Sequence, residues 1–362
     1  MQSSKNTCLF WLNFLISLLL MVSLLTLFET LLLSEPALAF ALKPIRIEED
    51  MGFDSIFRLV AADYCSSGRD QLVVLGRNYI ENTALCRVYS WSGGAWEQIW
   101  ESGNLIEEKS PIFLATGRPF ASGEETVMII TNHRLDIFTC STEGFALTSQ
   151  LDHTLLPQEI TVADIDGDGI DELIVARVGV VHKTYLDMTV EVYTLTESTA
   201  GAVSLHKLGG GPLCGNIRAM TGGDLDGDGQ VEVLIETGLG SKAGAFSLLK
   251  WTGRELVAES LTSPLNTAAY ALVNCRLPGA NRGRVVTVDG WGRVHSFSYE
   301  DGQFILHNEK TSLNSALVDA AWGDFDGDGL SELAVAGYPA KLFLLTGVQG
   351  SSVVECGKEK VE

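Results

Sequence analysis

The chain has 362 residues and carries 46 acidic against 25 basic side chains, which gives a formal net charge of −21. This acidic excess leaves no basic stripe, so it argues against nucleic acid or an anionic membrane surface as a partner.

Residues 1–39 form an N-terminal hydrophobic leader. Cys8–Phe28 is apolar apart from an occasional Asn or Ser, and it follows Lys5. The run is long enough to span a bilayer, whereas the apolar core of a signal peptide usually has about 7–15 residues. Residues 36–39, Pro-Ala-Leu-Ala, supply the small-x-small pattern that a signal peptidase cuts after, which favours a mature chain from Phe40.

The leader is therefore interpreted as a signal peptide or a membrane anchor. In both cases we expect the remainder, residues 40–362, to be extracytoplasmic, either secreted or anchored by the leader. Contact with a membrane is expected only through residues 1–39, and only if they are not cleaved.

The remainder repeats a unit of about 50 residues. Three acidic loops begin at Asp164, Asp224 and Asp324, so the second starts 60 residues after the first and the third 100 after the second. Weaker copies fill the missing places at residues 63–68, 116–125 and 274–279. The chain therefore contains six units.

In each unit, two further apolar segments follow the loop at a similar distance. With the segments before and after the loop they make four short antiparallel strands, the composition of a propeller blade. We predict an all-β chain with one six-bladed β-propeller, whose last two strands lie between Leu342 and Val354. Seven blades are disfavoured because the chain runs out. Separate β-sandwiches would need units of about 100 residues, and a nonapeptide β-helix a much shorter period.

The three loops share Asp at positions 1, 3 and 5, Gly at positions 4 and 6, and Glu at position 9. So many carboxylates repel one another unless a hard cation lies among them, and ligands that are all oxygen favour Ca²⁺. The helix-flanked EF-hand also begins this way, but its ligand at position 12 is replaced here by Val175, Ile235 and Val335. The β-branched runs that follow are typical of strands.

We expect each loop to bind one Ca²⁺ through four carboxylates and the backbone carbonyl of position 7. Ordinary Asp-Gly turns are the simpler alternative, but a turn needs only one Asp or Gly rather than the whole set. The expected ligands are Asp164, Asp166, Asp168, Ile170 and Glu172 in the first loop, Asp224, Asp226, Asp228, Gln230 and Glu232 in the second, and Asp324, Asp326, Asp328, Leu330 and Glu332 in the third.

These loops between short strands resemble the FG-GAP, or VCBS-type, repeats of integrin α-subunit propellers and of many bacterial exported proteins. The resemblance covers the chain after the leader and is specific only at the three intact loops. It implies calcium in the hairpin between the first and second strands of a blade, where the ion stiffens the loop. Cys65, Ser67 and Arg276 depart from the pattern, so we predict no metal in units one, two and five.

Six cysteines follow the leader, and their fifteen possible pairings are not resolved by the sequence. Cys65 and Cys275 belong to units that are not neighbours, so we expect no disulfide between them. For most of the six, we expect buried thiols.

No catalytic motif is present: the sequence contains neither His-Glu-x-x-His nor Gly-x-Ser-x-Gly. We therefore expect a non-enzymatic, calcium-binding propeller that binds an extracytoplasmic protein or glycan. The alternative is a hydrolase or lyase that acts on extracellular polysaccharide in the central channel. Asp, Glu, His or Tyr side chains that converge on the channel, apart from the three loops, would favour the enzyme. A third possibility is assembly with a neighbouring envelope protein.

Overall fold

The computed structural model describes residues 40–48, 51–105, 111–181, 186–198, 201–214, 217–239, 242–261, 265, 267–275 and 283–349. Ala41–Val348 form one compact unit. The described residues form strands and turns, and none of them belongs to a helix that is long and apolar enough to cross a membrane.

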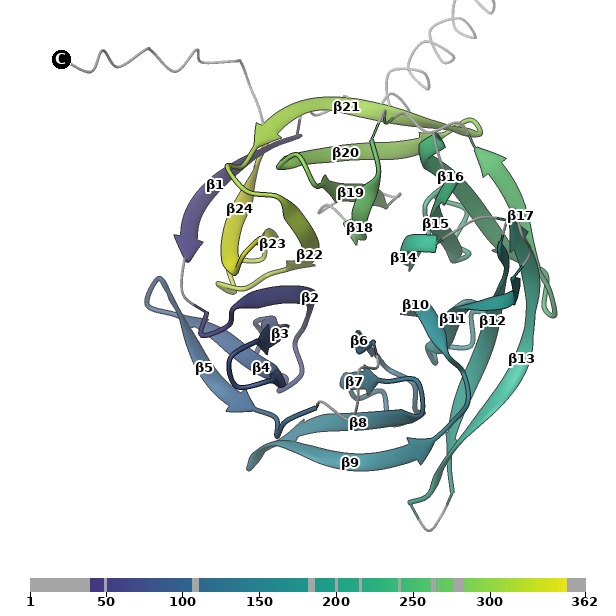
Figure 1. The fold of residues 1–362 in the computed structure, drawn as a ribbon, viewed down its shortest axis with the longest axis horizontal. Helices are drawn as coiled ribbons and strands as arrows, with labels where there is room; N and C mark the ends of the chain where they lie inside the picture. The colour runs from purple at the N-terminus through teal and green to yellow at the C-terminus, as the bar shows by residue number, and fades with distance from the viewer. Residues whose placement is uncertain are drawn as a thin grey trace, which may run out of the picture. The chain divides into compact units, whose positions relative to one another are not determined.

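The strands make six sheets of four strands each, arranged as the blades of a ring (Figure 1). Blade 1 contains β2 (Ser55–Ala62), β3 (Gln71–Asn78), β4 (Thr83–Ser92) and β5 (Ala95–Glu101). Blade 2 contains β6 (Phe113–Gly117), β7 (Thr126–Ile130), β8 (Arg134–Ser141) and β9 (Gly144–Asp152). Blade 3 contains β10 (Pro157–Ala163), β11 (Glu172–Val181), β12 (Leu186–Glu197) and β13 (Val203–Cys214).

The other three blades follow the same order, except at the end of the ring. Blade 4 contains β14 (Ile217–Gly223), β15 (Glu232–Leu239), β16 (Lys242–Trp251) and β17 (Leu256–Leu261). Blade 5 contains β18 (Ala269–Cys275), β19 (Arg284–Asp289), β20 (Arg293–Glu300) and β21 (Gln303–Ser312). Blade 6 contains β22 (Leu317–Gly323), β23 (Glu332–Gly337), β24 (Lys341–Gln349) and β1 (Phe40–Glu48).

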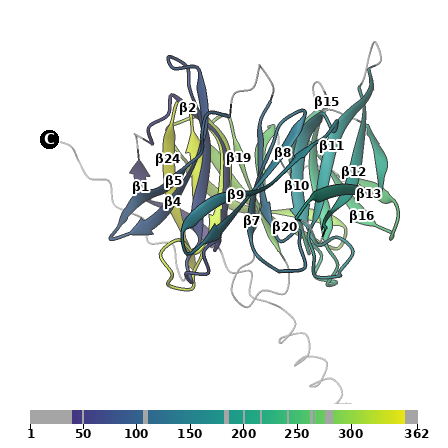
Figure 2. The same cartoon turned by 90° about the horizontal axis from the view of Figure 1, so that it is seen from below.

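The six innermost strands close a ring. Each of β2, β6, β10, β14, β18 and β22 contacts the innermost strands of the two neighbouring blades, and β22 contacts β2. The sheets stand side by side when the ring is viewed from its edge (Figure 2), and residues of the innermost strands of all six blades line a central cavity, called here the central channel. The prediction of an all-β propeller with six blades of four strands is confirmed.

The fourth strand of blade 6 was predicted wrongly. The sequence suggested a segment that ends near Val354, whereas the strand that completes this sheet is β1, from the start of the propeller. Val354 lies outside the described residues. Because β1 and β2 follow each other in the chain, blade 6 and blade 1 are joined both by this connection and by packing.

The hydrophobic core lies between neighbouring blades. The second strand of each blade is buried on both faces, as in β3, where Leu72 and Val74 pack towards blade 6 and Val73 and Leu75 pack towards blade 2. Continuous runs of Val, Ile and Leu favour this environment, and each fully buried aliphatic side chain contributes about 1.5–3 kcal/mol.

Each innermost strand leads into a hairpin loop. Because the innermost strands run in the same direction along the axis of the ring, these loops all lie at one end of the ring. The three acidic loops occupy this place in blades 3, 4 and 6. The loop of blade 5 was placed wrongly by the sequence, since Asn274 does not open it but lies within β18, opposite Val285.

Candidate metal centres and the central channel

The first acidic loop joins β10 to β11 in blade 3. Carboxylate oxygens of Asp164, Asp166 and Glu172 lie within 4.8 Å of one another. Asp166 is exposed, Asp164 is half-buried, and Glu172 is buried at the start of β11. Three carboxylates from positions 1, 3 and 9 therefore converge on one small volume at the edge of the ring.

The backbone of this loop is folded around Asp164. Its Oδ1 accepts hydrogen bonds from the N–H groups of Gly167 and Asp168 at 2.8 and 3.0 Å, and its Oδ2 accepts one from Gly169 at 2.9 Å. Gly167 and Gly169 have φ of 79° and 89°, a conformation that side chains with a Cβ rarely adopt. The Asp-x-Asp-Gly-Asp-Gly pattern thus encodes both the turn and the direction of its carboxylates.

The second and third loops repeat this geometry. Asp224, Asp226 and Glu232 form one group of converging carboxylates, and Asp324, Asp326 and Glu332 form the other. The bonds to the first aspartate are repeated by Gly227 and Gly229 at 2.8 and 3.2 Å, and by Gly327 and Gly329 at 2.8 and 2.9 Å. The three loops are therefore one structural element in three copies.

A buried side chain at position 2 anchors each loop to the blade. Ile165, Leu225 and Phe325 are buried, and the N–H of each donates a hydrogen bond to the position-9 glutamate at 3.0–3.1 Å. This contact holds Glu172, Glu232 and Glu332 beneath the loop. The sequence indicated the contact only by an apolar residue between two aspartates.

The pKa of Glu172 is raised to about 8, chiefly by burial and also by the charges of the loop aspartates, against a partial offset from the Ile165 N–H. Burial likewise raises the pKa of Glu232 and that of Glu332 to about 7. A cation among these oxygens would remove the cost of ionising the glutamates, because opposite charge favours the carboxylate form.

The donor set of these loops fits a hard divalent cation, since it consists of carboxylate oxygens held on a preformed backbone. The structure brings positions 1, 3 and 9 together. The aspartates of position 5, Asp168, Asp228 and Asp328, are engaged in the loop, where each accepts the N–H of position 7 at 2.8 Å. Ligation by these aspartates and by the carbonyls of Ile170, Gln230 and Leu330 stays a prediction.

No known protein family matches this sequence, and no curated protein does. The metal-binding interpretation therefore depends on the geometry of the loops and on their threefold repetition. What the geometry shows is three acidic groups that could hold a metal ion.

The second loop differs from the other two because a lysine reaches into it. Lys250 of β16 stands opposite Glu232 in the sheet. Its Nζ lies 2.5 Å from Asp226 Oδ2 and 3.7 Å from a carboxylate oxygen of Glu232. This ammonium partly offsets the rise in the pKa of Glu232.

The corresponding loop of blade 1, residues 63–71, keeps the turn and the aspartate of position 1 but loses the carboxylates of positions 3, 5 and 9. Asp63 accepts the N–H groups of Ser67 and Gly68 at 2.7 and 2.8 Å, as the first aspartates of the acidic loops do. Position 9 is Gln71, and position 3 is Cys65, which forms a disulfide with Cys140 at the end of β8 in blade 2. The prediction that this unit lacks a metal site is consistent with these residues but stays untested.

The disulfide answers part of the pairing question. Cys65 does not pair with Cys275, as expected, and Cys86 and Cys275 are buried thiols. The Cys65–Cys140 bridge joins neighbouring blades at the loop end of the ring. Nothing in the sequence distinguished this pair from the other possibilities.

Hydrogen bonds from a neighbouring blade hold the residue at position 1 in some of the hairpin loops. Asp70 of blade 1 accepts the N–H of Asp324 at 2.7 Å and donates its own N–H to the Asp324 carbonyl at 2.9 Å. Asp171 makes the same reciprocal pair with Arg118 of blade 2, at 2.6 and 3.0 Å. Both aspartates occupy position 8 of their own loop, so this position links one blade to the next.

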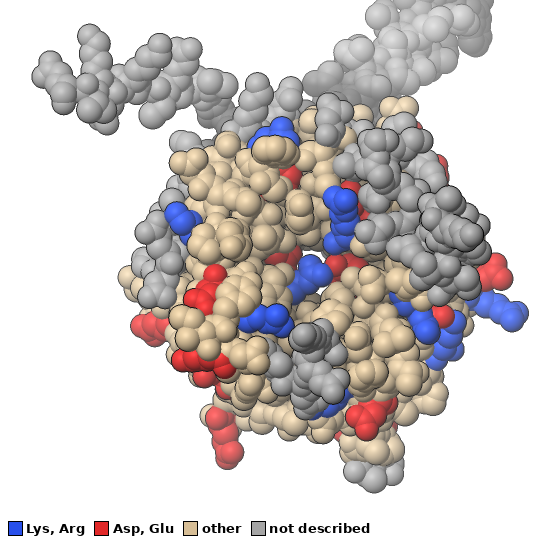
Figure 3. All heavy atoms as spheres, in the orientation of Figure 1, with Lys and Arg blue, Asp and Glu red and all other residues tan. Residues whose placement is uncertain are grey.

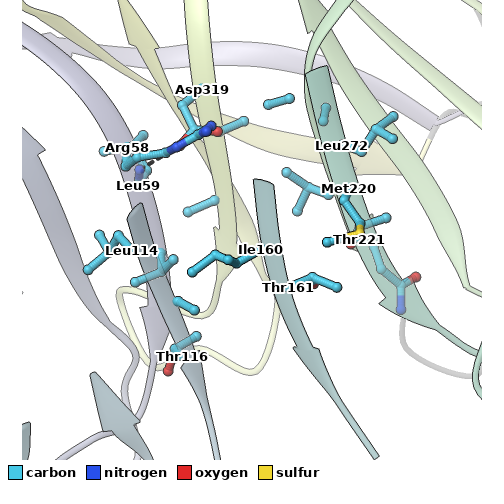
Figure 4. A pocket seen from close by; sticks show the side chains of 18 of the residues that line it. Arg58, Leu59, Leu114, Thr116, Ile160, Thr161, Met220, Thr221, Leu272 and Asp319 are labelled. Atoms are coloured by element: carbon cyan, nitrogen blue, oxygen red, sulfur yellow. Dashed lines mark hydrogen bonds between the residues drawn. The ribbon is translucent and has the colours of Figure 1, made fainter. Parts of the chain in front are cut away.

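The central channel contains a second group of carboxylates. Arg58 of β2 donates to Glu159 of β10 at 2.6 Å, and Asp319 of β22 accepts the N–H of Leu59 at 2.7 Å. Figure 4 shows Arg58 and Asp319 next to each other at the wall of the cavity, and charges of both signs surround the central opening (Figure 3). The sequence offered no sign of this cluster, because its members are far apart along the chain.

Both channel carboxylates are buried, and burial raises the pKa of Asp319 to about 7, against the charge of Arg58 and the Leu59 N–H, which favour ionisation. Burial also raises the pKa of Glu159, again opposed by Arg58. The cavity has a volume of about 290 Å³, and apolar side chains line it beside the charged group. These are Leu59, Leu114, Ile160, Met220 and Leu272.

Proposed function

We propose that this protein is an exported, calcium-binding β-propeller that acts as a non-enzymatic binding module for a protein or glycan outside the cytoplasm. Ca²⁺ at the acidic loops would supply the counter-charge that the carboxylates need and would fix the loops as a rigid surface. The leader sequence supports the location, since it has the features of a signal peptide or an anchor.

One observation carries the calcium proposal: three loops, far apart in the chain, orient the same three carboxylates with the same backbone hydrogen bonds. A single acidic turn is ordinary surface chemistry. Chance does not readily repeat a buried glutamate, an apolar anchor and two left-handed glycines three times. The oxygen-only donor set and the flexible coordination of Ca²⁺ favour calcium over transition metals.

The test is thermal unfolding of the purified protein in a chelator and in millimolar calcium. A ligand that binds only the folded state stabilises it by about 2.7 kcal/mol for each site at a hundredfold excess over Kd. We expect calcium to raise the melting temperature, and magnesium to raise it less because Mg²⁺ demands stricter geometry.

Substitution identifies the sites. Asp164→Ala and Asp324→Ala should each remove part of the calcium shift, and the matched control Glu143→Ala, an exposed acid in the β8–β9 turn, should remove none. Equal melting temperatures in chelator and calcium for the unaltered protein would end the proposal. A pull-down from extracytoplasmic material, with calcium and with chelator, then tests whether the partner binds the calcium-loaded form.

A second candidate function is favoured by the channel cluster. Glu159 and Asp319 are buried carboxylates outside the loops, and the pKa of Asp319 near 7 suits a group that exchanges a proton at neutral pH. This arrangement supports a hydrolase or lyase that acts on polysaccharide. Against it, Arg58 already holds Glu159, and backbone N–H groups already hold both carboxylates.

The enzyme alternative predicts product release from acidic and neutral polysaccharides, measured as new reducing ends or as unsaturated sugars. Asp319→Asn should abolish that release while leaving the calcium shift unchanged. The binding proposal predicts no release from the unaltered protein, and calcium-dependent capture of a partner by the Asp319→Asn variant as well.

A further inference from the structure

The three acidic loops differ at one cross-strand position. The position-9 glutamate pairs with Lys250 in blade 4 and with Thr346 in blade 6. In blade 3, Leu173 pairs with Tyr193, so the register carries Thr194 opposite Glu172. Two loops therefore face a neutral threonine, and one faces an ammonium group.

Lys250 is placed to act as a counter-ion. Its Nζ lies 2.5 Å from Asp226 Oδ2 and 3.7 Å from Glu232, which are two of the three converging carboxylates of its loop. Its side chain is 43% exposed, so it reaches the loop from the solvent side and is free to swing away.

An ammonium at this place conflicts with a calcium ion. Ca²⁺ binds oxygen ligands at about 2.3–2.6 Å, and the Asp226 oxygen that would face it already accepts a charged hydrogen bond. An ammonium group has only donors, so it cannot join the coordination shell. Calcium must therefore break the ion pair and then repel the displaced charge.

The first and third loops have no such competitor among the described residues. No Lys, Arg or His in that part of the chain forms an ion pair with Asp164, Asp166 or Glu172, or with the three acids of the third loop. Arg69 of blade 1 does lie against Gly327 of the third loop, but it forms no ion pair with the acids of that loop.

We infer that Lys250 is the resident cation of the second loop, so that the propeller has two strong calcium sites, in blades 3 and 6, and a third that is weakened at least tenfold. This inference rests on the proposed calcium function. Lys250 keeps the loop of blade 4 ordered at low calcium, because it already neutralises part of the charge of that loop.

The experiment isolates the second loop. In a protein that carries Asp164→Ala and Asp324→Ala, calorimetric titration with CaCl₂ reports loop two alone. Lys250→Thr reproduces the threonine of blade 6 and should tighten binding there about tenfold or more. Lys250→Arg keeps the charge and should bind as weakly as the parent.

Equal Kd values for the parent, Lys250→Thr and Lys250→Arg would overturn the inference while leaving the calcium proposal intact. If the double alanine background does not fold, the same variants are titrated with all loops intact, where two tight sites should become three in Lys250→Thr. Three equal sites in the unaltered protein would overturn the inference. No binding at any loop would overturn both proposals.

Discussion

Carboxylates crowd in two regions of this propeller, and the chain treats the two regions differently. In the channel, Arg58 lies beside Glu159 and Asp319, so the protein supplies its own positive charge. In the loops of blades 3 and 6, three carboxylates converge, and none of them forms an ion pair with a chain cation among the residues described. The loop of blade 4 is intermediate, because Lys250 neutralises part of it.

The difference separates carboxylates that the chain neutralises itself from carboxylates that could hold a metal ion. A buried carboxylate is tolerated when an arginine and backbone N–H groups satisfy it, as in the channel. Where two loop aspartates and a buried glutamate converge and form no ion pair with the described part of the chain, a cation from solution would relieve the repulsion.

The largest effect should come from removing the channel cation. Arg58→Met leaves Glu159 and Asp319 buried without a positive charge, and breaking a buried pair in this way costs about 3–5 kcal/mol. Urea unfolding at pH 8 measures the loss, and a combined Arg58→Met, Glu159→Gln variant should recover part of it. A loss below about 1 kcal/mol would show that water already solvates the cluster and would weaken the contrast with the loops.

The loop of blade 1 sharpens the comparison with the acidic loops, because it is joined to blade 2 by the Cys65–Cys140 disulfide. Replacing both Cys65 and Cys140 by Ser should cost about 2–4 kcal/mol by urea unfolding. The loss should be the same in chelator and in calcium, since this loop lacks the acidic ligands. A loss of stability that appears only in chelator would mean that the disulfide and calcium at the acidic loops stabilise the ring jointly.

Asp319 makes a prediction about pH. Its pKa is about 7 in the folded protein, above its ordinary 3.8, so the folded state holds a proton that the unfolded state has released. Its contribution to stability is therefore lost as pH rises through 7. Between pH 5 and 8 the free energy of unfolding should fall by about 2.6 kcal/mol on this account, because the fall occurs almost entirely below pH 7 and each pH unit there corresponds to about 1.4 kcal/mol.

The control for that experiment is Asp319→Asn, which keeps an acceptor for the Leu59 N–H but does not titrate. Both proteins are measured in saturating calcium, so that titration of the loop glutamates does not contribute. The stability of the variant minus that of the unaltered protein should increase as pH rises, because only the unaltered protein loses the contribution of Asp319. A constant difference would contradict the assignment to Asp319.

The smallest effect concerns the shared turn itself. Ser66, at position 4 of the blade 1 loop, has φ of 51°, where the acidic loops have glycine, for example Gly167 at 79°. Ser66→Gly should remove the strain of a left-handed residue and stabilise the protein by less than about 1 kcal/mol. The reverse change, Gly167→Ser, should destabilise the protein. If neither change alters the free energy of unfolding, the left-handed conformation at position 4 does not strain serine, and the prediction is wrong.

The repeat pattern was sufficient to predict the fold. A regular spacing of Asp-Gly loops and β-branched runs identifies blades because every blade uses the same local chemistry. Positions 1, 3 and 9 of the acidic loops were also predictable, because the glycines at positions 4 and 6 impose the turn that brings them together.

The remaining features depend on contacts between distant segments. Lys250 meets the second loop only through the register of β15 with β16, and Arg58 meets Glu159 only because the ring closes. The Cys65–Cys140 bridge requires two neighbouring blades to be in place. The period of a repeat describes each unit alone, so it carries no information about which residues of different units come into contact.

The exchange of β1 into the last blade sets the order in which this molecule can be completed. β1 precedes all the other described strands in the chain, and it finds its partner, β24, only after all the intervening blades have been made. Until then β1 lacks this partner strand, and an unpaired strand edge favours unwanted association during folding. Once β1 pairs with β24, strands from the beginning and the end of the propeller lie in one sheet, and neither can detach without breaking the backbone hydrogen bonds that close the ring.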